Sequence, residues 1–168
     1  MSLQKSDELL DFLRQHGIQA KTFDHAPVHT VAESRALRGD IPGAHTKNLF
    51  LRDSKRRFFL VVTDENTPIH LKALGPAIGA RGGLSFGSQE ALLEHLGITP
   101  GAVSLLAAIN DRQKQVTVVI DRALLEHAPI NCHPLTNERT TSLTREDIAA
   151  FFSATGHEPQ YVNLPAGT

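Results

Sequence analysis

The spacing of apolar residues predicts helices and strands that interleave along the whole chain. Leu9, Leu10 and Leu13 recur at helical spacing within residues 3–16, and Gly17 follows as a stop. Runs rich in β-branched and aromatic residues alternate with such helical segments. The predicted helices are residues 3–16, 30–38, 69–74, 88–96, 122–126 and 145–154, and the predicted strands are residues 20–24, 47–51, 58–62, 84–86, 105–109, 115–120, 130–133 and 139–143.

Two pairs of these strands have the spacing of hairpins. Residues 47–51 and 58–62 flank a polar turn, and residues 105–109 and 115–120 flank a second one. Because a hairpin pairs its strands antiparallel, the pattern favours an α+β fold over a doubly wound parallel sheet. No repeat or composition shift marks a boundary, so residues 1–168 are predicted to form a single domain, with residues 158–168 as a peripheral tail.

The strand at residues 47–51 places a lysine at one end of an apolar face. Side chains alternate along a strand, so Lys47, Leu49 and Leu51 share one face, while Asn48 and Phe50 share the other. One interpretation is a lysine whose stem covers apolar surface while its ammonium reaches water. The other is a cation at the mouth of a pocket for an anionic or polar ligand.

A glycine-rich turn and a histidine are further candidates for chemistry. Residues 97–101, Gly-Ile-Thr-Pro-Gly, can turn sharply and present N–H groups to a developing negative charge, or can simply end a helix. His133 ends the strand at residues 130–133, where a lone histidine is commonly structural. Cys132 is expected in the core, because neighbours on a strand point to opposite faces and cannot form a thiol–imidazole pair.

Composition and charge exclude several classes of protein. The net charge of −1 gives no general attraction to nucleic acid, so any contact with RNA is expected to be local. The nine histidines show no metal-ligand spacing, and no metal is predicted. With no membrane-length apolar run, no signal peptide and one cysteine, we expect a cytoplasmic protein that does not bind membranes. The candidate RNA patch is Arg52, Lys55, Arg56, Arg57, Lys72 and Arg81, although a solvated hairpin turn explains the first four equally well.

Five motifs stand in the order found in one known family. They are His29-Thr30-Val31-Ala32-Glu33, Lys47-Asn48-Leu49-Phe50-Leu51, Leu84-Ser85-Phe86, the run from Leu96 to Ser104, and His133-Pro134-Leu135-Thr136-Asn137. With them the chain resembles the YbaK/ProX family of aminoacyl-tRNA editing domains, and especially its freestanding prolyl-tRNA deacylases of the ProXp-ala type. The resemblance implies a mixed, largely antiparallel, barrel-like sheet surrounded by helices.

The resemblance also implies a function. It implies a trans-editing hydrolase that deacylates mischarged tRNA-Pro by water attack on the aminoacyl ester at the 3′-terminal adenosine. Alanine is the implied amino acid and cysteine is the second choice, while another small aminoacyl ester is a third possibility. The alternative from another class is a non-catalytic module of the same fold that binds the aminoacyl-tRNA end. Prolyl-tRNA synthetase is a candidate partner, and no cofactor is implied.

With the resemblance, the expected site contains three catalytic and five substrate-binding positions. Lys47 is expected to face the terminal phosphate or the reacting group, His133 to orient the substrate or a water, and Gly101 to supply backbone donors. The expected substrate-binding residues are Thr46, Asn48, Gly97, Pro100 and Thr136. The sequence offers no convincing protein nucleophile, which agrees with a water activated by the ribose hydroxyl of the substrate. Leu135 is bulkier than the residue expected there, so the selectivity of the pocket stays open.

Overall fold

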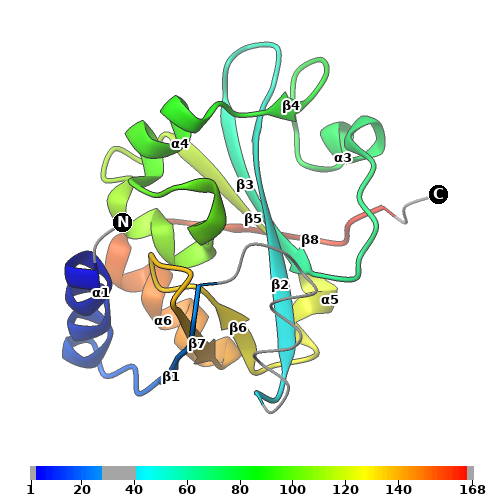
Figure 1. Cartoon of the computed structure of the whole chain (residues 1–168). Coiled ribbons are helices and arrows are strands. Elements are labelled where there is room, and N and C mark those ends of the chain that lie inside the picture. Colours follow the sequence, from blue (N-terminus) through cyan, green and yellow to red (C-terminus); the bar gives the residue numbers. More distant parts are fainter. Residues whose placement is uncertain (1–2, 28–40, 166–168) are drawn as a thin grey trace.

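The protein forms a mixed eight-stranded sheet with helices packed on both faces (Figure 1). The computed structural model describes residues 3–27 and 41–165. The helices are α1 (Leu3–Gln15), α3 (Leu71–Ala77), α4 (Gln89–Leu96), α5 (Arg122–Leu125) and α6 (Arg145–Thr155), with 3-10 helices η1 (Pro100–Ala102) and η2 (Leu105–Asn110). The strands are β1 (Lys21–Asp24), β2 (Ala44–Arg52), β3 (Phe58–Asp64), β4 (Ser85–Phe86), β5 (Val116–Asp121), β6 (Ile130–Cys132), β7 (Arg139–Leu143) and β8 (Gln160–Val162).

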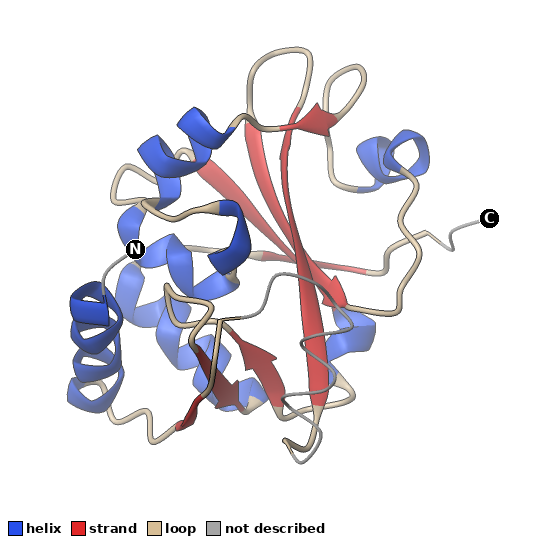
Figure 2. Ribbon diagram, in the orientation of Figure 1, coloured by secondary structure: helices blue, strands red, loops and turns tan. Residues whose placement is uncertain are grey.

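Strand β2 joins the two halves of the sheet. The strand order is β1-β7-β6-β2-β3-β5-β8, and β4 pairs with the end of β2 (Figure 2). The first residues of β2 pair in parallel with β6, whereas residues from Thr46 onward pair antiparallel with β3 in the predicted hairpin. The β3–β5 and β5–β8 pairs are also parallel, and the remaining pairs are antiparallel. The predicted α+β class with a mixed sheet is therefore confirmed.

Each face of the sheet packs against its own set of helices. The larger core takes Phe50 of β2 and buries the apolar sides of α1, α4, η2 and α6, including Phe151 and Phe152. The smaller core lies on the other face, where Leu51 packs with Leu74 and Ile78 from α3 and its C-terminal end. Alternate residues of β2 thus enter different cores, as the pattern of the strand predicts.

Helix boundaries follow the capping residues in the sequence. Ser88 caps α4 by accepting a hydrogen bond from the Ala91 N–H, and Gly97 ends this helix at a φ of 65°. Thr144 and Asp147 form a capping box at the start of α6. The predicted helix at residues 30–38, together with the motif at residues 29–33, lies outside the described residues.

The second predicted hairpin is wrong. The segment predicted as a strand at residues 105–109 forms the buried 3-10 helix η2, capped by the Ser104 side chain on the Leu106 N–H. A short apolar run does not distinguish a buried helix from a strand, and β5 pairs in parallel with β3 instead.

The segment expected as a peripheral tail contains β8, which pairs along β5 at the edge of the sheet. Within the described residues, no helix has both the length and the apolar character needed to span a membrane.

Candidate functional site

One face of β2 changes from apolar to polar along the strand. Leu49 and Leu51 contribute to the smaller core, while Lys47 and His45 precede them on the same face. On the neighbouring strand β3, Thr63 pairs with Lys47. The Thr63 hydroxyl is fully buried and donates a hydrogen bond of 2.7 Å to the carboxylate of Asp121 on β5. A polar row therefore crosses β2, β3 and β5 beside the smaller core.

His133 extends this polar row on the other side of β2. The parallel register pairs Ala44 with Ile130 and His45 with Asn131, and His133 follows one residue past the end of β6. Ile130 and Cys132 point into the larger core, which leaves Asn131 and His133 on the opposite face. Adjacent strands lie about 4.8 Å apart. The ammonium and the imidazole thus arise from neighbouring strands on one face of the sheet.

The hydrogen bonds of His133 define which ring nitrogen is available. Its Nδ1 lies 2.8 Å from the carbonyl oxygen of Arg139, and a carbonyl only accepts, so Nδ1 carries the proton and Nε2 has the lone pair in the neutral ring. Burial lowers the pKa of His133 below its ordinary 6.5; the Arg139 carbonyl opposes this shift, and the nearby imidazoles of His25 and His45 add to it. His133 is therefore neutral at pH 7.

Lys47 is half-buried, and its ammonium has no hydrogen bond or ion pair with any residue in the described ranges 3–27 and 41–165. A lysine held among strands without a carboxylate partner is an electrostatic binding position for an anion or a developing negative charge. This placement, at the polar end of a face that is otherwise core, is the one that the alternation of the strand predicts.

Thr46 and Asn48 lie on the other face of β2. The Thr46 hydroxyl donates to the carbonyl oxygen of Asn131 at 2.9 Å, and the Asn48 amide donates to the Thr46 hydroxyl at 3.4 Å. The Thr46 bond joins β2 to β6, and the Asn48 bond is made within β2, both on the face opposite Lys47. The Asn48 Oδ1 is buried and has no hydrogen-bond partner among the described residues. The structure thus separates Thr46 and Asn48 from Lys47 by the thickness of the sheet.

The loop at residues 97–101 divides into two parts. The Gly97 N–H donates to the Leu93 carbonyl as the cap of α4, so this donor is already used. Pro100 and Gly101 are exposed and belong to η1. A side chain on Gly101 would come within 3.3 Å of the Asn137 amide nitrogen, which places this turn against the segment that follows His133.

The segment after His133 is anchored in the protein interior. The Ser104 hydroxyl donates a hydrogen bond of 2.6 Å to the His133 carbonyl, linking this segment to the end of the 97–101 loop region. Leu135 adopts a φ of 64° and is buried in the larger core, so its bulk fills the interior. Thr136 is buried and its hydroxyl accepts a hydrogen bond from the Glu138 N–H at 3.3 Å. Cys132 is buried in the larger core, as predicted, and this burial raises the pKa of its thiol to about 12.

Sequence reasoning did not find His25, His45, Thr63 and Asp121. The His25 ring lies 6.3 Å from the His133 ring and bonds to the Thr140 hydroxyl. His45 stands two residues before Lys47, so the alternation that placed Lys47 could also have placed it. Thr63 and Asp121 come together only through the β3–β5 pairing, which a sequence pattern does not show. In the described part of the chain, no three or more His, Cys, Asp or Glu side chains form a group that could hold a metal ion.

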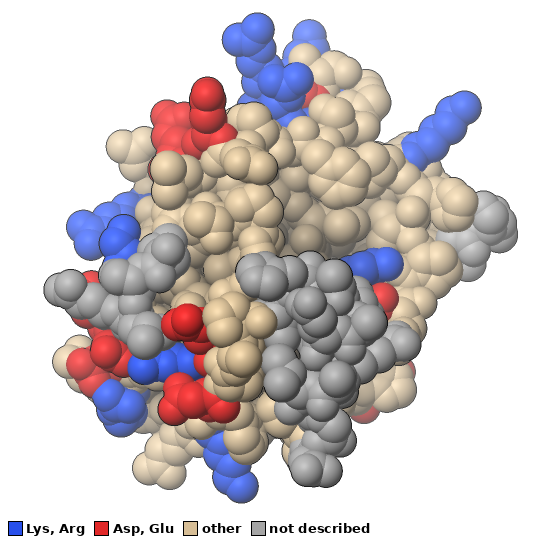
Figure 3. Space-filling model, in the orientation of Figure 1, with Lys and Arg blue, Asp and Glu red and all other residues tan. Residues whose placement is uncertain are grey.

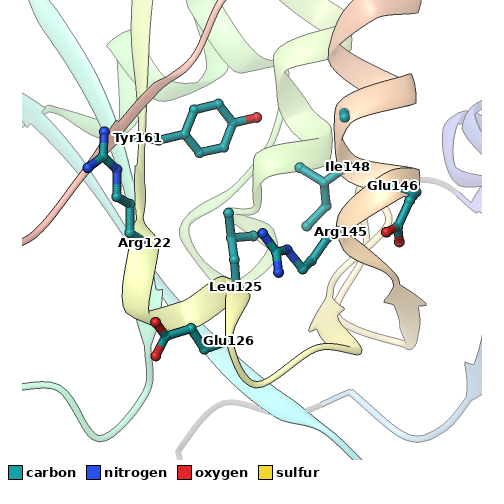
Figure 4. Close-up of a pocket in the computed structure, with 8 residues that line it drawn as sticks. Arg122, Leu125, Glu126, Arg145, Glu146, Ile148 and Tyr161 are labelled. Carbon is teal, nitrogen blue, oxygen red and sulfur yellow. The ribbon is translucent and has the colours of Figure 1, made fainter.

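A separate pocket of about 760 Å³ lies between α5, α6 and β8 (Figure 4). Arg122 and Arg145 flank it, the Tyr161 ring lies across it, and Leu125 and Ile148 form an apolar part of its wall. None of its lining residues belongs to the face that carries Lys47 and His133. Arginines and glutamates both line this pocket, so its charges do not favour one class of ligand. The candidate functional site is therefore the polar face of β2.

The chain belongs to the aminoacyl-tRNA editing domain family, whose model matches residues 25–151. This match includes β2, the 97–101 loop and the segment that contains His133. The predicted family is therefore confirmed, and the fold described above is that of an editing domain.

Two named relatives agree with this assignment, and a solved structure shares the fold. The chain is 38% identical over 154 residues to the prolyl-tRNA synthetase associated domain-containing protein 1 of Danio rerio, which covers 90% of the chain and 83% of the relative. It is 33% identical over 165 residues to the prolyl-tRNA editing protein ProX of Acetoanaerobium sticklandii, covering 98% of the chain and 100% of the relative. A crystal structure described as a candidate trans-editing enzyme for prolyl-tRNA synthetase shares the fold, with a TM-score of 0.71 and 16% identity over 96% of the chain and 98% of that structure.

Proposed function

We propose that the protein hydrolyses the ester between alanine and the 3′-terminal adenosine of mischarged tRNA-Pro. The family is that of aminoacyl-tRNA editing, and the named relatives are connected with prolyl-tRNA. The observation that carries the proposal is that the half-buried Lys47, which has no ion pair among the described residues, lies on the same face of the sheet as the neutral imidazole of His133. Cysteinyl-tRNA-Pro is the alternative substrate, and prolyl-tRNA synthetase is a candidate partner that would present the tRNA.

The reaction needs no protein nucleophile. The oxygen of a water forms a bond with the ester carbonyl carbon, and the bond from this carbon to the ribose oxygen breaks. The ribose oxygen leaves with the electron pair and takes up the proton that the water releases, so the products are free alanine and tRNA with a free hydroxyl. The neighbouring ribose hydroxyl can relay this proton. The protein then contributes positioning and charge stabilisation.

Lys47 provides the positive charge in this scheme. Its ammonium lies against the terminal phosphate or the carbonyl oxygen, where negative charge develops as the water attacks. Lys47 is half-buried and no carboxylate of the described residues pairs with its ammonium, so none of these residues neutralises its charge. Loss of one such stabilising group costs about a hundredfold to a thousandfold in rate.

His133 and the η1 turn complete the site. The Nδ1 bond to Arg139 fixes the ring, so that Nε2 can accept a hydrogen bond from the attacking water or from the substrate amino group. Pro100 and Gly101 present exposed backbone beside the segment after His133 and would limit the size of the amino acid. Four expected substrate-binding residues support the backbone that carries these groups in this scheme. Thr46, Gly97 and Thr136 make their bonds within the protein, and the Asn48 amide nitrogen bonds to Thr46 on the face opposite Lys47.

Deacylation of Ala-tRNA-Pro by the wild type, Lys47→Ala and Lys47→Arg tests the proposal, with Cys-tRNA-Pro and Ala-tRNA-Ala as further substrates. We expect rapid release of alanine from tRNA-Pro, a loss of at least about a hundredfold in Lys47→Ala, and partial activity in Lys47→Arg. Lys5→Ala, which removes an exposed lysine on α1, is the control and should retain full activity. Release of cysteine alone would change the substrate, and binding without release of either amino acid would mean that the domain is a binding module.

A further inference from the structure

The carbonyl oxygen that holds the His133 ring belongs to Arg139, the first residue of β7. This oxygen lies 2.8 Å from His133 Nδ1. The antiparallel register of β6 and β7 sets Cys132 opposite Thr141, and if the ladder continued past Cys132, Pro134 would face Arg139. Proline has no N–H to donate, so the ladder ends here and the Arg139 carbonyl accepts from the imidazole instead.

The side chain of Arg139 bonds to two other elements, α1 and β1. Its Nη1 donates to the Asp7 carboxylate at 2.7 Å and to the buried Ser6 hydroxyl at 3.1 Å, both on α1. Its Nε donates to the Asp24 carboxylate on β1 at 3.0 Å. The planar guanidinium has donors in a fixed arrangement, so one arginine can bind two carboxylates at once. The Arg139 side chain is only 16% exposed, and these three bonds hold it in one place. In Figure 3, Lys and Arg atoms lie between Asp and Glu atoms on the side of the molecule that carries α1 and β1.

Arg139 connects the two faces of the sheet. It lies four residues before Leu143 on β7, so both side chains are on one face, and Leu143 is buried in the larger core. Helix α1 covers this face and is fixed to the same core by Leu9 and Leu13. His133 lies on the opposite face. The backbone of Arg139 therefore joins the packing of α1 on one face to the imidazole on the other.

We propose that Arg139 is a positioning residue for the reaction. Its guanidinium, held by Asp7 and Asp24, fixes the start of β7, and its carbonyl then keeps the proton of the neutral His133 ring on Nδ1 and the lone pair on Nε2. This inference rests on the proposed function, in which Nε2 accepts a hydrogen bond from the water or the substrate. A neutral imidazole has two tautomers, and only one of them leaves Nε2 able to accept. A carbonyl held within hydrogen-bond distance of Nδ1 selects that tautomer, because a carbonyl cannot donate.

The tautomer of His133 is measured in the free protein, without substrate. Long-range correlation spectra of protons and 15N separate a ring nitrogen that bears a proton from one with a lone pair, and His133→Gln identifies the His133 signals. Above the ordinary imidazole pKa of about 6.5, we expect the wild type to have its proton on Nδ1. In Arg139→Ala we expect averaged shifts for the two nitrogens, because both tautomers are then populated. Arg139→Lys keeps a cation that can reach one of the carboxylates, so it should restore part of the wild-type signal.

Deacylation of Ala-tRNA-Pro gives the second readout. We expect Arg139→Ala to lower kcat by about tenfold or more with little change in KM, because a misplaced group slows the reaction while the surfaces that bind the substrate stay in place. Asp7→Asn/Asp24→Asn keeps the arginine but removes both carboxylates, and it should change the tautomer and kcat in the same direction. The matched control is Glu8→Gln/Asp11→Asn, which removes two exposed carboxylates of α1 that do not bond to Arg139 in the described part of the chain. It should keep the wild-type tautomer and kcat.

Thermal unfolding of each variant separates positioning from a purely structural role. A lower unfolding temperature in Arg139→Ala with the wild-type tautomer and kcat would overturn the inference, since Arg139 would then only hold α1 to the sheet. Equal tautomer spectra of Asp7→Asn/Asp24→Asn and the control would also overturn it, and this comparison decides the question if Arg139→Ala does not fold. If the wild type releases no amino acid from tRNA-Pro, the proposed function fails, while the spectra still decide whether Arg139 sets the state of the His133 ring.

Discussion

Asp53 lies in the turn between β2 and β3, and replacing it by alanine should lower the free energy of unfolding. The carboxylate accepts four hydrogen bonds, three from backbone N–H groups and one from the Arg57 guanidinium. A hydrogen bond contributes about 1 kcal/mol net, and more when one partner is charged. The Arg57 side chain is half exposed, so water replaces much of its lost contact. We therefore expect a loss of about 3 kcal/mol in the free energy of unfolding.

The pH dependence of stability gives this prediction a second readout. Burial alone would raise the pKa of Asp53, but the backbone N–H groups of Arg81 and Arg57, together with the guanidinium, outweigh it and lower the pKa from 3.8 to about 2. The folded state therefore binds its proton more weakly than the unfolded state. The stabilisation is fully present above pH 3.8 and is lost as the pH falls toward 2.

Urea unfolding of the wild type, Asp53→Ala and Asp53→Asn between pH 2 and pH 6 measures both effects. The difference in unfolding free energy between wild type and Asp53→Asn should be largest above pH 4 and should shrink as the pH falls, because only the wild type has the carboxylate to protonate. Ser54→Ala, an exposed position in the same turn, is the control. A loss below about 1 kcal/mol in Asp53→Ala, or a difference that stays constant with pH, would refute this reasoning.

Three further predictions concern other parts of the molecule. Thr144→Ala removes the capping box of α6 and should cost about 1 kcal/mol in urea unfolding, whereas Thr155→Ala at the other end should cost less. Phe151→Ala empties a fully buried site between Phe12 and Phe152 and should cost about 3 to 5 kcal/mol. Deacylation should persist as the pH falls to 6.5 and decline only below it, because burial lowers the pKa of His133; His25→Ala should move this decline to higher pH.

The sequence predicts the parts of the fold that depend on local chemistry. Ser88, Gly97 and Thr144 mark helix ends where the structure has them, because capping bonds form between residues a few positions apart. The faces of β2 were predicted because alternation is a property of any strand. The segment at residues 105–109 was predicted wrongly because an apolar run of this length fits either a strand or a buried helix.

The sequence predicts the candidate site only in part, because several of its residues come together only through the pairing of strands that are distant in the sequence. Strand alternation puts Lys47 at the polar end of an apolar face, but it gives no information on which strand lies beside it. The parallel pairing of β2 with β6 brings in His133, and the pairing of β3 with β5 brings Asp121 to Thr63. These contacts join residues tens of positions apart, so they depend on the tertiary fold. The sequence allows Gly97 to be either a helix cap or part of a substrate-facing turn. Its φ of 65° and the bond from its N–H to the Leu93 carbonyl identify it as the cap of α4.

Single-turnover deacylation of Ala-tRNA-Pro by wild type and Lys47→Ala, with Lys5→Ala in parallel, measures whether Lys47 contributes to the reaction. We expect wild type and Lys5→Ala to release alanine at the same rate, and Lys47→Ala to be slower by about a hundredfold or more while its folding is unchanged. Equal rates for wild type and Lys47→Ala would contradict the assignment of the site. Intact Ala-tRNA-Pro after incubation with the wild type would contradict the activity itself.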